Sequence, residues 1–360
     1  MRRTPALIVG GGPAGSAAAI RLAQGGIPPL LVERTAGAHD TVCGGFTGWD
    51  ALAALRRIGV VPEALGARPI TRLRVVAAGR TAEADLPHQA AGLSRRTLDE
   101  VLLAAAREAG AEVLRGRTAR AVEDAPLRFR LDEEELEGEQ LFLATGKHEL
   151  RGHARPVNGG AVGLRTALEP SPAMRGALEG LIELHLYDGG YAGLLLQDDG
   201  RANLCLSVSA ARLKSAGGRD GLLGTLADEL PLLRARLDDS EAGEWSAISG
   251  VPYGWRAGKT LPGIYRIGDQ GAVVASLAGD GIAIALESGI AAADALLAGE
   301  GAQTYQRRFS ARSRRPLAVA ESLRWAAERS APRAAMMQML RWFPGIAPLA
   351  ARLTRIGGTA

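Results

Sequence analysis

The chain has 360 residues, of which 47% are hydrophobic and 4% aromatic, and a formal net charge of +4. This length allows one large domain or two modest ones, and the composition excludes disordered, collagen-like and low-complexity chains. No stretch approaches the roughly 18 unbroken apolar residues of a transmembrane helix, and the apolar run at 6–9 is too short for a signal peptide. The two cysteines, Cys43 and Cys205, offer no disulfide framework and no CxxC pair, so we expect a protein of the reducing cytoplasm.

The N-terminal segment has the pattern of a nucleotide-binding strand–helix–strand unit. A short apolar strand is predicted at 6–9, followed by a glycine turn, a helix of small residues that ends at Gly25 and Gly26, and a strand that ends in Glu33. The turn holds G-x-G-x-x-G, whose glycines permit a tight turn, the approach of a pyrophosphate and close packing of the helix on the sheet. Glu33 is placed to accept hydrogen bonds from ribose hydroxyls. We therefore predict a dinucleotide site formed by Gly10, Gly12, Pro13, Ala14, Gly15, Glu33 and Arg34.

Helices and strands continue to alternate up to about residue 150. The pattern predicts a helix at 50–60, a β-hairpin at 72–86 that turns at Gly79, a helix that begins near Arg95 and a buried strand at 141–144.

The pattern then changes to a run of strands between about 155 and 255. An Asp-Asp-Gly turn at 198–200 is typical of a tight hairpin, so we expect an antiparallel sheet inserted into the nucleotide domain. A strand, a loop and a long helix return at 263–299, and the last sixty residues are predicted to be helical.

A second fingerprint decides which dinucleotide is expected. The strand at 265–267 ends in Gly-Asp, and a Gly-Asp-Gly turn ten residues further on opens the long helix. An acid at Asp269 can hold the ribityl chain of FAD, and the helix N-terminus at Gly281 would point at the flavin pyrimidine. Asp280 is also placed to cap this helix. We therefore predict FAD as the cofactor, with further contacts from Gly268, Asp269, Gly279, Asp280, Gly281 and Ile282.

The two fingerprints, with SRRTLDEVLLAAAREAGAEV between them, resemble the flavoprotein superfamily of para-hydroxybenzoate hydroxylase and geranylgeranyl reductase. The resemblance covers roughly residues 1–150 and 260–300, and the middle and the tail are similar only in topology. It implies that Arg95 contacts the FAD, whereas a helix-capping arginine on the surface is the alternative.

The resemblance also bears on the segment VCGGF at 42–46. In the geranylgeranyl-reductase branch a Cys-Gly-Gly segment passes beside the isoalloxazine ring, and Cys43, Gly44 and Gly45 stand at the matching place. Glycines there would let the backbone lie against the ring. Cys43 is then a thiol beside the flavin, and two alternatives remain open, a reactive group and a small polarizable filler.

Three features depart from the superfamily. Hydroxylases usually carry Asp-Gly where this chain has Thr145-Gly146, so the usual handling of a nicotinamide does not carry over, although both residues are still expected beside the FAD. Ala275-Ser276 replaces a usual proline, and no Trp-x-Trp is present, so the flavin-halogenase signature is absent. Lys147 would either meet a nicotinamide phosphate or lie in a surface loop.

The middle stretch supplies the remaining candidates. Tyr191 and Tyr253, with Trp255, cluster where the inserted sheet should face the flavin, and they form either a substrate wall or ordinary core. His185, in an alternating strand, is interpreted as a packed or solvent-facing histidine and not as a base. No carboxylate pair or Ser/His/Asp set indicates hydrolysis, and no His/Cys spacing indicates a metal.

The predicted fold is α/β, a Rossmann-like FAD-binding domain with an inserted antiparallel β-sheet substrate domain and C-terminal helices. The FAD-binding domain is expected at 1–155 and 257–300, the substrate domain at 156–256 and the helical segment at 301–360. This last segment carries 11 arginines and two acids. We interpret it as amphipathic helices that pack on the rest of the chain and do not bind nucleic acid, with contact to an anionic lipid surface if the substrate is membrane-borne.

These features predict an FAD-dependent oxidoreductase. The favoured reaction is hydroxylation, by a flavin monooxygenase, of an aromatic or polyketide-like small molecule; the alternative is reduction of C=C bonds in an apolar, isoprenoid-like substrate. A non-enzymatic flavoprotein sensor or carrier is the third hypothesis. No second G-x-G-x-x-G follows a strand, so electrons would come from NAD(P)H visiting transiently or from a separate reductase. Cys43, Tyr191 and Tyr253 are the candidate catalytic residues.

Overall fold

A five-stranded parallel sheet carries the N-terminal fingerprint. In the computed structural model, which describes residues 2–124, 127–132, 134–156 and 160–357, its strand order is β18-β11-β2-β3-β7. All four neighbouring pairs are parallel. The strands span, in that order, Ile264–Arg266, Leu141–Leu143, Leu7–Val9, Leu30–Glu33 and Glu112–Arg115.

Both faces of this sheet are buried, as is usual for parallel sheets. Ile8, Leu31 and Phe142 face the helices α1 (Pro13–Gln24), α3 (Arg95–Glu108) and α8 (Gly281–Leu297). The residues next to them in the same strands, such as Leu7, Leu30 and Leu141, point to the opposite face and pack on a small four-stranded sheet of order β1-β10-β9-β8. The strands of that sheet span Arg2–Thr4, Glu134–Gly138, Leu127–Leu131 and Ala119–Asp124.

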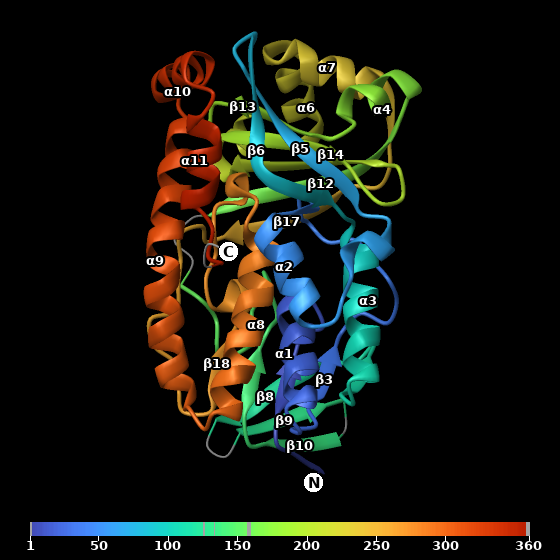
Figure 1. Cartoon of the computed structure of the whole chain (residues 1–360), viewed down its shortest axis with the longest axis vertical. Helices are drawn as coiled ribbons and strands as arrows, with labels where there is room; N and C mark the ends of the chain where they lie inside the picture. The colour runs from blue at the N-terminus through green and yellow to red at the C-terminus, as the bar shows by residue number, and fades with distance from the viewer. Residues whose placement is uncertain (1, 125–126, 133, 157–159, 358–360) are drawn as a thin grey trace.

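The second half of the molecule is a nine-stranded sheet of order β16-β12-β15-β14-β13-β5-β6-β4, with β17 paired to β12 (Figure 1). Its pairs are antiparallel except for β13 with β5, which is parallel. The predicted turn at 198–200 joins β14 to β15. The strands span Ser240–Ala242, Ala161–Pro170, Ala202–Ser209, Gly190–Leu196, Leu181–Tyr187, Arg68–Ala77, Arg80–Gly92, Phe46–Thr47 and, for β17, Ser246–Val251.

This sheet differs from the expected insertion in one respect. Three of its strands, β4 to β6, come from residues 46–92, because β5 pairs with the middle-domain strand β13 and brings the hairpin with it. The expected fold class is confirmed, whereas the domain boundaries stay a prediction. The outer face of the sheet is covered by four helices, α4 (Pro172–Leu178), α5 (Ala210–Ser215), α6 (Arg219–Glu229) and α7 (Pro231–Asp238).

The C-terminal helices join the two halves. Figure 1 shows α9 (Ala302–Ala327) running along the side of the molecule next to α8, with α10 (Ser330–Trp342) and α11 (Ile346–Leu353) beside the large sheet and α2 (Trp49–Arg57) between the halves. Leu317 and Met337 are buried, as a packed tail requires. No helix in the described ranges is long and apolar enough to cross a membrane.

An ion cluster lies buried within the large sheet, beside α7. Glu183 of β13 accepts hydrogen bonds from Arg74 Nη1 at 2.8 Å, Arg236 Nη2 at 3.1 Å and His185 Nε2 at 2.8 Å. His185 is thus a packed side chain in this position. Burial would raise the pKa of Glu183, but these hydrogen bonds outweigh it and lower the pKa to about 2.

We expect Glu183→Gln to lower the free energy of unfolding at neutral pH by about 3 kcal/mol, because two arginines lose a buried counter-charge. A carboxyl with a depressed folded pKa stabilises the fold above its unfolded value of 4.5, and that stabilisation is lost as the pH falls toward 2. The difference in the free energy of unfolding between wild type and Glu183→Gln should therefore be smaller by about 2 kcal/mol near pH 3 than at neutral pH. Denaturant unfolding across this range measures it, with exposed Glu169→Gln as control; a gap that does not vary with pH would contradict the assignment.

Candidate functional site

Two adjoining cavities lie between the parallel sheet and the large sheet. The larger, of about 450 Å³, runs along Gly10, Gly12, Glu33 and Arg34. The smaller, of about 180 Å³, reaches the inner face of the large sheet. Both are lined by Gly12, Arg95, Gly146, Lys147 and Asp269, so they form one continuous groove.

The glycines of the groove fall into two kinds. Gly10 and Gly15 are needed for packing, since a Cβ on Gly15 would lie 1.9 Å from the Gly10 carbonyl oxygen and Gly10 has φ +110°. Gly12, Gly44, Gly146 and Gly281 instead present bare backbone to the smaller cavity. A Cβ on Gly44, Gly146 or Gly281 would meet no protein atom within 4 Å, and one on Gly12 would meet only Arg95 Nη2 at 3.2 Å. These bare faces are what a ligand lying against the backbone requires.

Two helix N-termini open onto the same groove. The first turns of α1, at Pro13 and Ala14, and of α8, at Gly281 and Ile282, line the smaller cavity. Neither helix has a side-chain cap, so the free N–H groups and the partial positive charge of both helices are available to an anionic or polar ligand.

Glu33 lies at the edge of the larger cavity and braces the glycine turn. One carboxylate oxygen accepts from the Gly11 N–H at 2.7 Å and the other from the Thr35 N–H at 2.8 Å. Its neighbour Arg34 lies 2.6 Å from His148 Nε2. Their contacts with a ribose stay a prediction.

Arg95 is the first residue of α3 and lines both cavities. Its guanidinium makes two hydrogen bonds to Asp99, at 2.8 and 2.7 Å. Burial would lower the pKa of Arg95, but Asp99 outweighs burial and raises it. The alternative of a surface capping residue is wrong, because Ser94 caps the helix and the Arg95 side chain is only 16% exposed.

Lys147 and Asp269 face one another where the two cavities meet. Lys147 Nζ lies 3.5 Å from Asp269 Oδ2, and although burial would lower the pKa of Lys147, Asp269 raises it. Lys147 lies in the turn after β11 with its side chain 29% exposed, and the choice between a nicotinamide phosphate and a surface loop stays a prediction. Gln270, which the sequence did not single out, holds this junction together by donating to the Gly146 and His148 carbonyls, both at 3.0 Å. Thr145 Oγ1 donates to the same His148 carbonyl at 2.6 Å.

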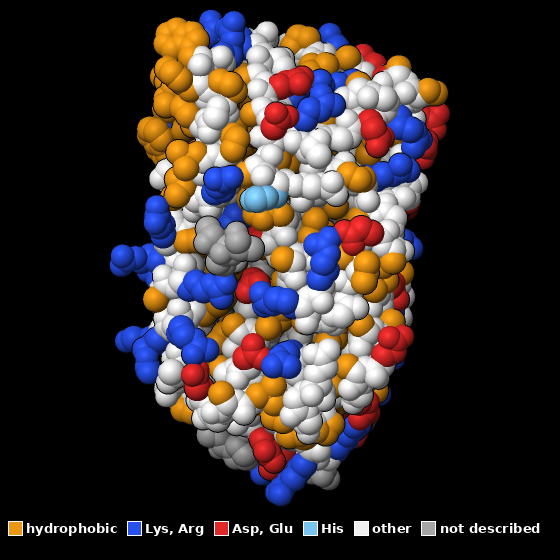
Figure 2. Space-filling model, in the orientation of Figure 1, with side chains coloured by type: hydrophobic (Ala, Val, Ile, Leu, Met, Phe, Trp, Pro, Cys, Tyr) orange, Lys and Arg blue, Asp and Glu red, His pale blue; other side chains and the backbone are white. Residues whose placement is uncertain are grey.

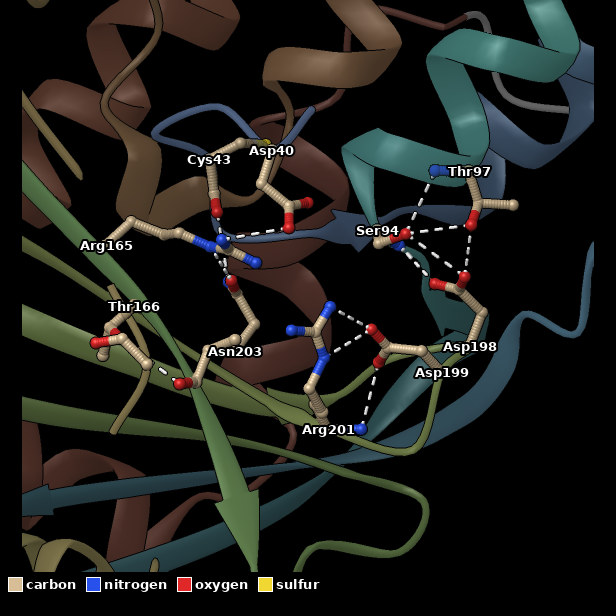
Figure 3. Close-up of polar contacts among 12 residues, drawn as sticks. Asp40, Cys43, Ser94, Thr97, Arg165, Thr166, Asp198, Asp199, Arg201 and Asn203 are labelled. Atoms are coloured by element: carbon tan, nitrogen blue, oxygen red, sulfur yellow. Dashed lines mark hydrogen bonds and ion pairs between the residues drawn. The ribbon is translucent and has the colours of Figure 1, made fainter. Parts of the chain in front are cut away.

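The Cys-Gly-Gly segment is held in place from the large sheet (Figure 3). Asn203 Nδ2 of β15 donates to the carbonyls of Cys43 and Gly44, at 3.1 and 2.9 Å. Asn203 Oδ1 in turn accepts from Arg165 Nε of β12 at 2.7 Å, and Arg165 pairs with Asp40 at 3.1 Å. Gly45 has φ +69° and packs against Gln197. Gly44 is therefore the residue at which the lack of a side chain leaves space toward the groove.

A second link in the same view fixes the start of α3. Asp198, in the turn between β14 and β15, accepts from the Ser94 N–H at 2.6 Å and from Thr97 Oγ1 at 2.5 Å (Figure 3). The hairpin turn predicted from Asp-Asp-Gly thereby also positions Arg95, the residue that follows Ser94.

The smaller cavity contains both cysteines and several hydroxyl groups. Cys43 lines it beside Cys205 of β15, and burial raises the pKa of Cys205 to about 12, so this thiol is neutral. Sequence reasoning had no signal that would place Cys205 in a site, because its strand has the pattern of an ordinary core strand.

Tyr191 and Tyr253 also line this cavity, whereas Trp255 does not. Tyr253 Oη lies 2.9 Å from Ser276 Oγ, and Ser276 stands where the superfamily usually has proline. Tyr191 is buried, and no described atom is in hydrogen-bonding geometry with its hydroxyl. Burial and the neighbouring Tyr253 raise the pKa of Tyr191 well above 10, so the hydroxyl keeps its proton.

Asp280 departs from its predicted role. Its carboxyl is fully buried outside both cavities and makes no cap hydrogen bond to α8. It pairs instead with Arg355, beyond α11, at 2.6 Å, and Arg355 also lies 4.2 Å from the Trp49 ring centroid. Burial raises the pKa of Asp280, and Arg355 opposes the rise. The predicted cap is wrong because the buried acid takes a counter-charge from the tail.

Comparison with known proteins agrees with this geometry. Residues 3–145 match the FAD binding domain family. The chain is 28% identical to the menaquinone reductase of Mycobacterium tuberculosis over 376 residues, which cover 97% of this chain and 88% of the relative. It is 26% identical over 306 residues to digeranylgeranylglycerophospholipid reductase 2 of Methanopyrus kandleri, with coverage of 79% and 74%. Its fold matches p-nitrophenol 4-monooxygenase of Pseudomonas putida with a TM-score of 0.78 at 15% identity, over the full length of both chains.

These findings confirm the resemblance predicted from the sequence: residues 3–145 match an FAD binding domain, and relatives named as reductases match most of the chain. FAD is the cofactor of this flavoprotein. The bare glycine faces, the two helix N-termini and the carboxylates of Glu33 and Asp269 along the groove fit it. The assignment of individual residues to parts of the FAD stays a prediction.

We expect Asp269→Ala to lose FAD more severely than Glu33→Ala. Hydrogen bonds to charged groups contribute about 1.5–3 kcal/mol each, and Asp269 also holds Lys147 at the junction of the two cavities. The FAD released per chain after gel filtration and denaturation measures the loss. Asp220→Ala removes an exposed acid of α6, on the outer face of the large sheet, and serves as control. Equal FAD retention in the Asp269 and Glu33 variants would contradict the assignment.

Proposed function

We propose that this FAD-dependent oxidoreductase reduces C=C bonds in an apolar, isoprenoid-like substrate. The observation that carries the proposal is the wall of the smaller cavity beyond the glycines. It is formed by aliphatic side chains from the inner face of the large sheet and the loop before α8, among them Ile182, Leu184, Leu195, Val273 and Leu277. The charged residues that line this cavity are Arg95, Lys147 and Asp269, all at the end shared with the larger cavity. An apolar chain is the substrate class that such walls accept at least cost.

The reaction adds a hydride to one carbon of the double bond and a proton to the other. Bound FAD supplies the hydride chemistry. We propose that the Tyr191 hydroxyl gives this proton, because it is protonated and lies in the wall of the smaller cavity. The hydroxyls of Tyr253 and Ser276 adjoin the Tyr191 hydroxyl and provide a route by which a proton returns to Tyr191.

The relatives support the same choice. Two reductases match most of this chain, one named for menaquinone and one for a digeranylgeranylglycerophospholipid. The lipid in the second name carries geranylgeranyl groups, which are isoprenoid chains. A monooxygenase acting on an aromatic substrate is the second candidate, and the presence of two tyrosines in an enclosed wall favours it. For either reaction we propose that NAD(P)H visiting transiently, or a separate reductase, supplies the electrons.

Anaerobic and aerobic turnover separate the two reactions. The FAD-loaded protein is reduced with dithionite without oxygen and mixed with a geranylgeranyl lipid or with p-nitrophenol. We expect the lipid to reoxidise the flavin anaerobically and to gain two hydrogen atoms per reduced bond by mass spectrometry. Reoxidation that needs oxygen, with one oxygen atom added to the aromatic compound, would show the monooxygenase instead. No product from either probe would count against both.

Tyr191→Phe should slow formation of the saturated product by about 10²- to 10⁴-fold, the usual contribution of a general acid, while FAD content and reduction by dithionite stay unchanged. Tyr187→Phe is the matched control, because Tyr187 is a buried tyrosine of the neighbouring strand that does not line the cavity. Equal product formation by the Tyr191 variant and wild type would exclude Tyr191 as the proton donor.

A further inference from the structure

The end of the molecule formed by α9 to α11 exposes large apolar side chains. We call this surface the apolar cap and define it as Trp325, Met339, Trp342, Phe343 and Leu349, which are 50–68% exposed. Across the described ranges, the other exposed large hydrophobic residues are Val61 and Leu261. Figure 2 shows hydrophobic side chains gathered over α10 and the adjoining part of α9. Trp325, Trp342 and Phe343 belong to the segment that the sequence predicts to pack on the rest of the chain, and their own side chains stay exposed. A cluster of this kind marks an interaction surface.

Arginines accompany the apolar cap without counter-charges. Arg329, Arg341 and Arg352 are exposed, and no described carboxylate lies within ion-pair distance of them. The one acid between 325 and 357 is Glu328, which pairs with Arg324 at 2.8 Å. Arg329 lies over the Trp325 ring, 5.0 Å from its centroid. The surface therefore combines aromatic side chains with unpaired positive charge.

The inner side of the same helix forms part of the structure behind the cavity. Met336, Met337 and Leu340 of α10 pack in one cluster with Leu184, Tyr191 and Leu277. Leu184, Tyr191 and Leu277 also line the smaller cavity. A single helix, α10, therefore separates the apolar cap from the cavity wall.

We propose that the apolar cap docks into the surface of an anionic lipid bilayer and that the substrate reaches the cavity from this membrane past α10. Tryptophan and phenylalanine beside arginine are suited to the boundary between acyl chains and phosphate headgroups. A second copy of the chain fits less well, because a two-fold contact would bring the unpaired arginines of both copies together without acids between them. The route of the substrate rests on the proposed function, whereas the docking does not.

Vesicle binding tests the docking directly. The FAD-loaded protein is sedimented with phosphatidylcholine vesicles and with vesicles that also contain phosphatidylglycerol. We expect binding to the anionic vesicles, with a blue shift of tryptophan fluorescence, and at least tenfold weaker binding by the double variant Trp342→Ser/Phe343→Ser. Val61→Ser/Leu261→Ser is the matched control, because it removes two hydrophobic side chains, 55% and 49% exposed, elsewhere on the surface. Arg341→Gln/Arg352→Gln should lose the preference for the anionic vesicles.

The outcomes separate docking from catalysis. Equal binding by the apolar-cap variant and wild type, or no binding by wild type, would overturn the docking. A dimer of wild type in sedimentation velocity that the apolar-cap variant loses would show a contact between copies and would also overturn it. FAD content shows whether each variant is folded.

If wild type binds vesicles but reduces no geranylgeranyl lipid, the docking stands and the proposed reaction fails. If docking serves substrate delivery, the apolar-cap variant should reduce a detergent-dispersed lipid normally and a vesicle-borne lipid more slowly.

Discussion

The close approach of α1 and α8 is the constraint on which the site depends. A Cβ on Gly289 of α8 would lie 2.2 Å from the Ala14 carbonyl oxygen of α1, and one on Gly268 would lie 3.0 Å from the Ala14 side chain. Only small residues allow this contact. Because of it, the N-termini of two helices nearly 270 residues apart in sequence open onto one groove. Their combined partial positive charge is what a cofactor with phosphates and a polar ring can use.

The large sheet completes the groove by holding segments of the nucleotide half. Asn203 fixes the Cys43–Gly44 backbone, and Asp198 fixes the start of α3 and with it Arg95. Both residues lie near the turn between β14 and β15. The sheet that forms the apolar wall of the smaller cavity is thus also the element that positions the bare backbone of the groove, so changes at this turn would affect both.

The C-terminal helices connect the groove to the outside of the molecule. Arg355 holds Asp280 and so anchors the tail at the start of α8, while α10 backs the apolar wall. The tail is therefore part of the folded core along one side and an exposed apolar surface along the other. This division explains how a strongly basic segment with many hydrophobic residues can be structural and still expose apolar side chains.

The sequence alone determined the strand–helix–strand unit, the cofactor class and the general architecture, because glycine spacing and apolar periodicity are local signals. It did not determine that β4 to β6 join the large sheet, that Asp280 pairs with Arg355, or that Lys147, Gln270 and Cys205 line or hold the groove. Each of these depends on a contact between segments that are far apart in the chain. The local sequence pattern around a residue does not indicate which distant residue it will contact. The same holds for Trp342 and Phe343, since an apolar residue on a helix looks alike in sequence whether its face meets the core or solvent. Burial is a property of the assembled fold, and only the tertiary structure decided it.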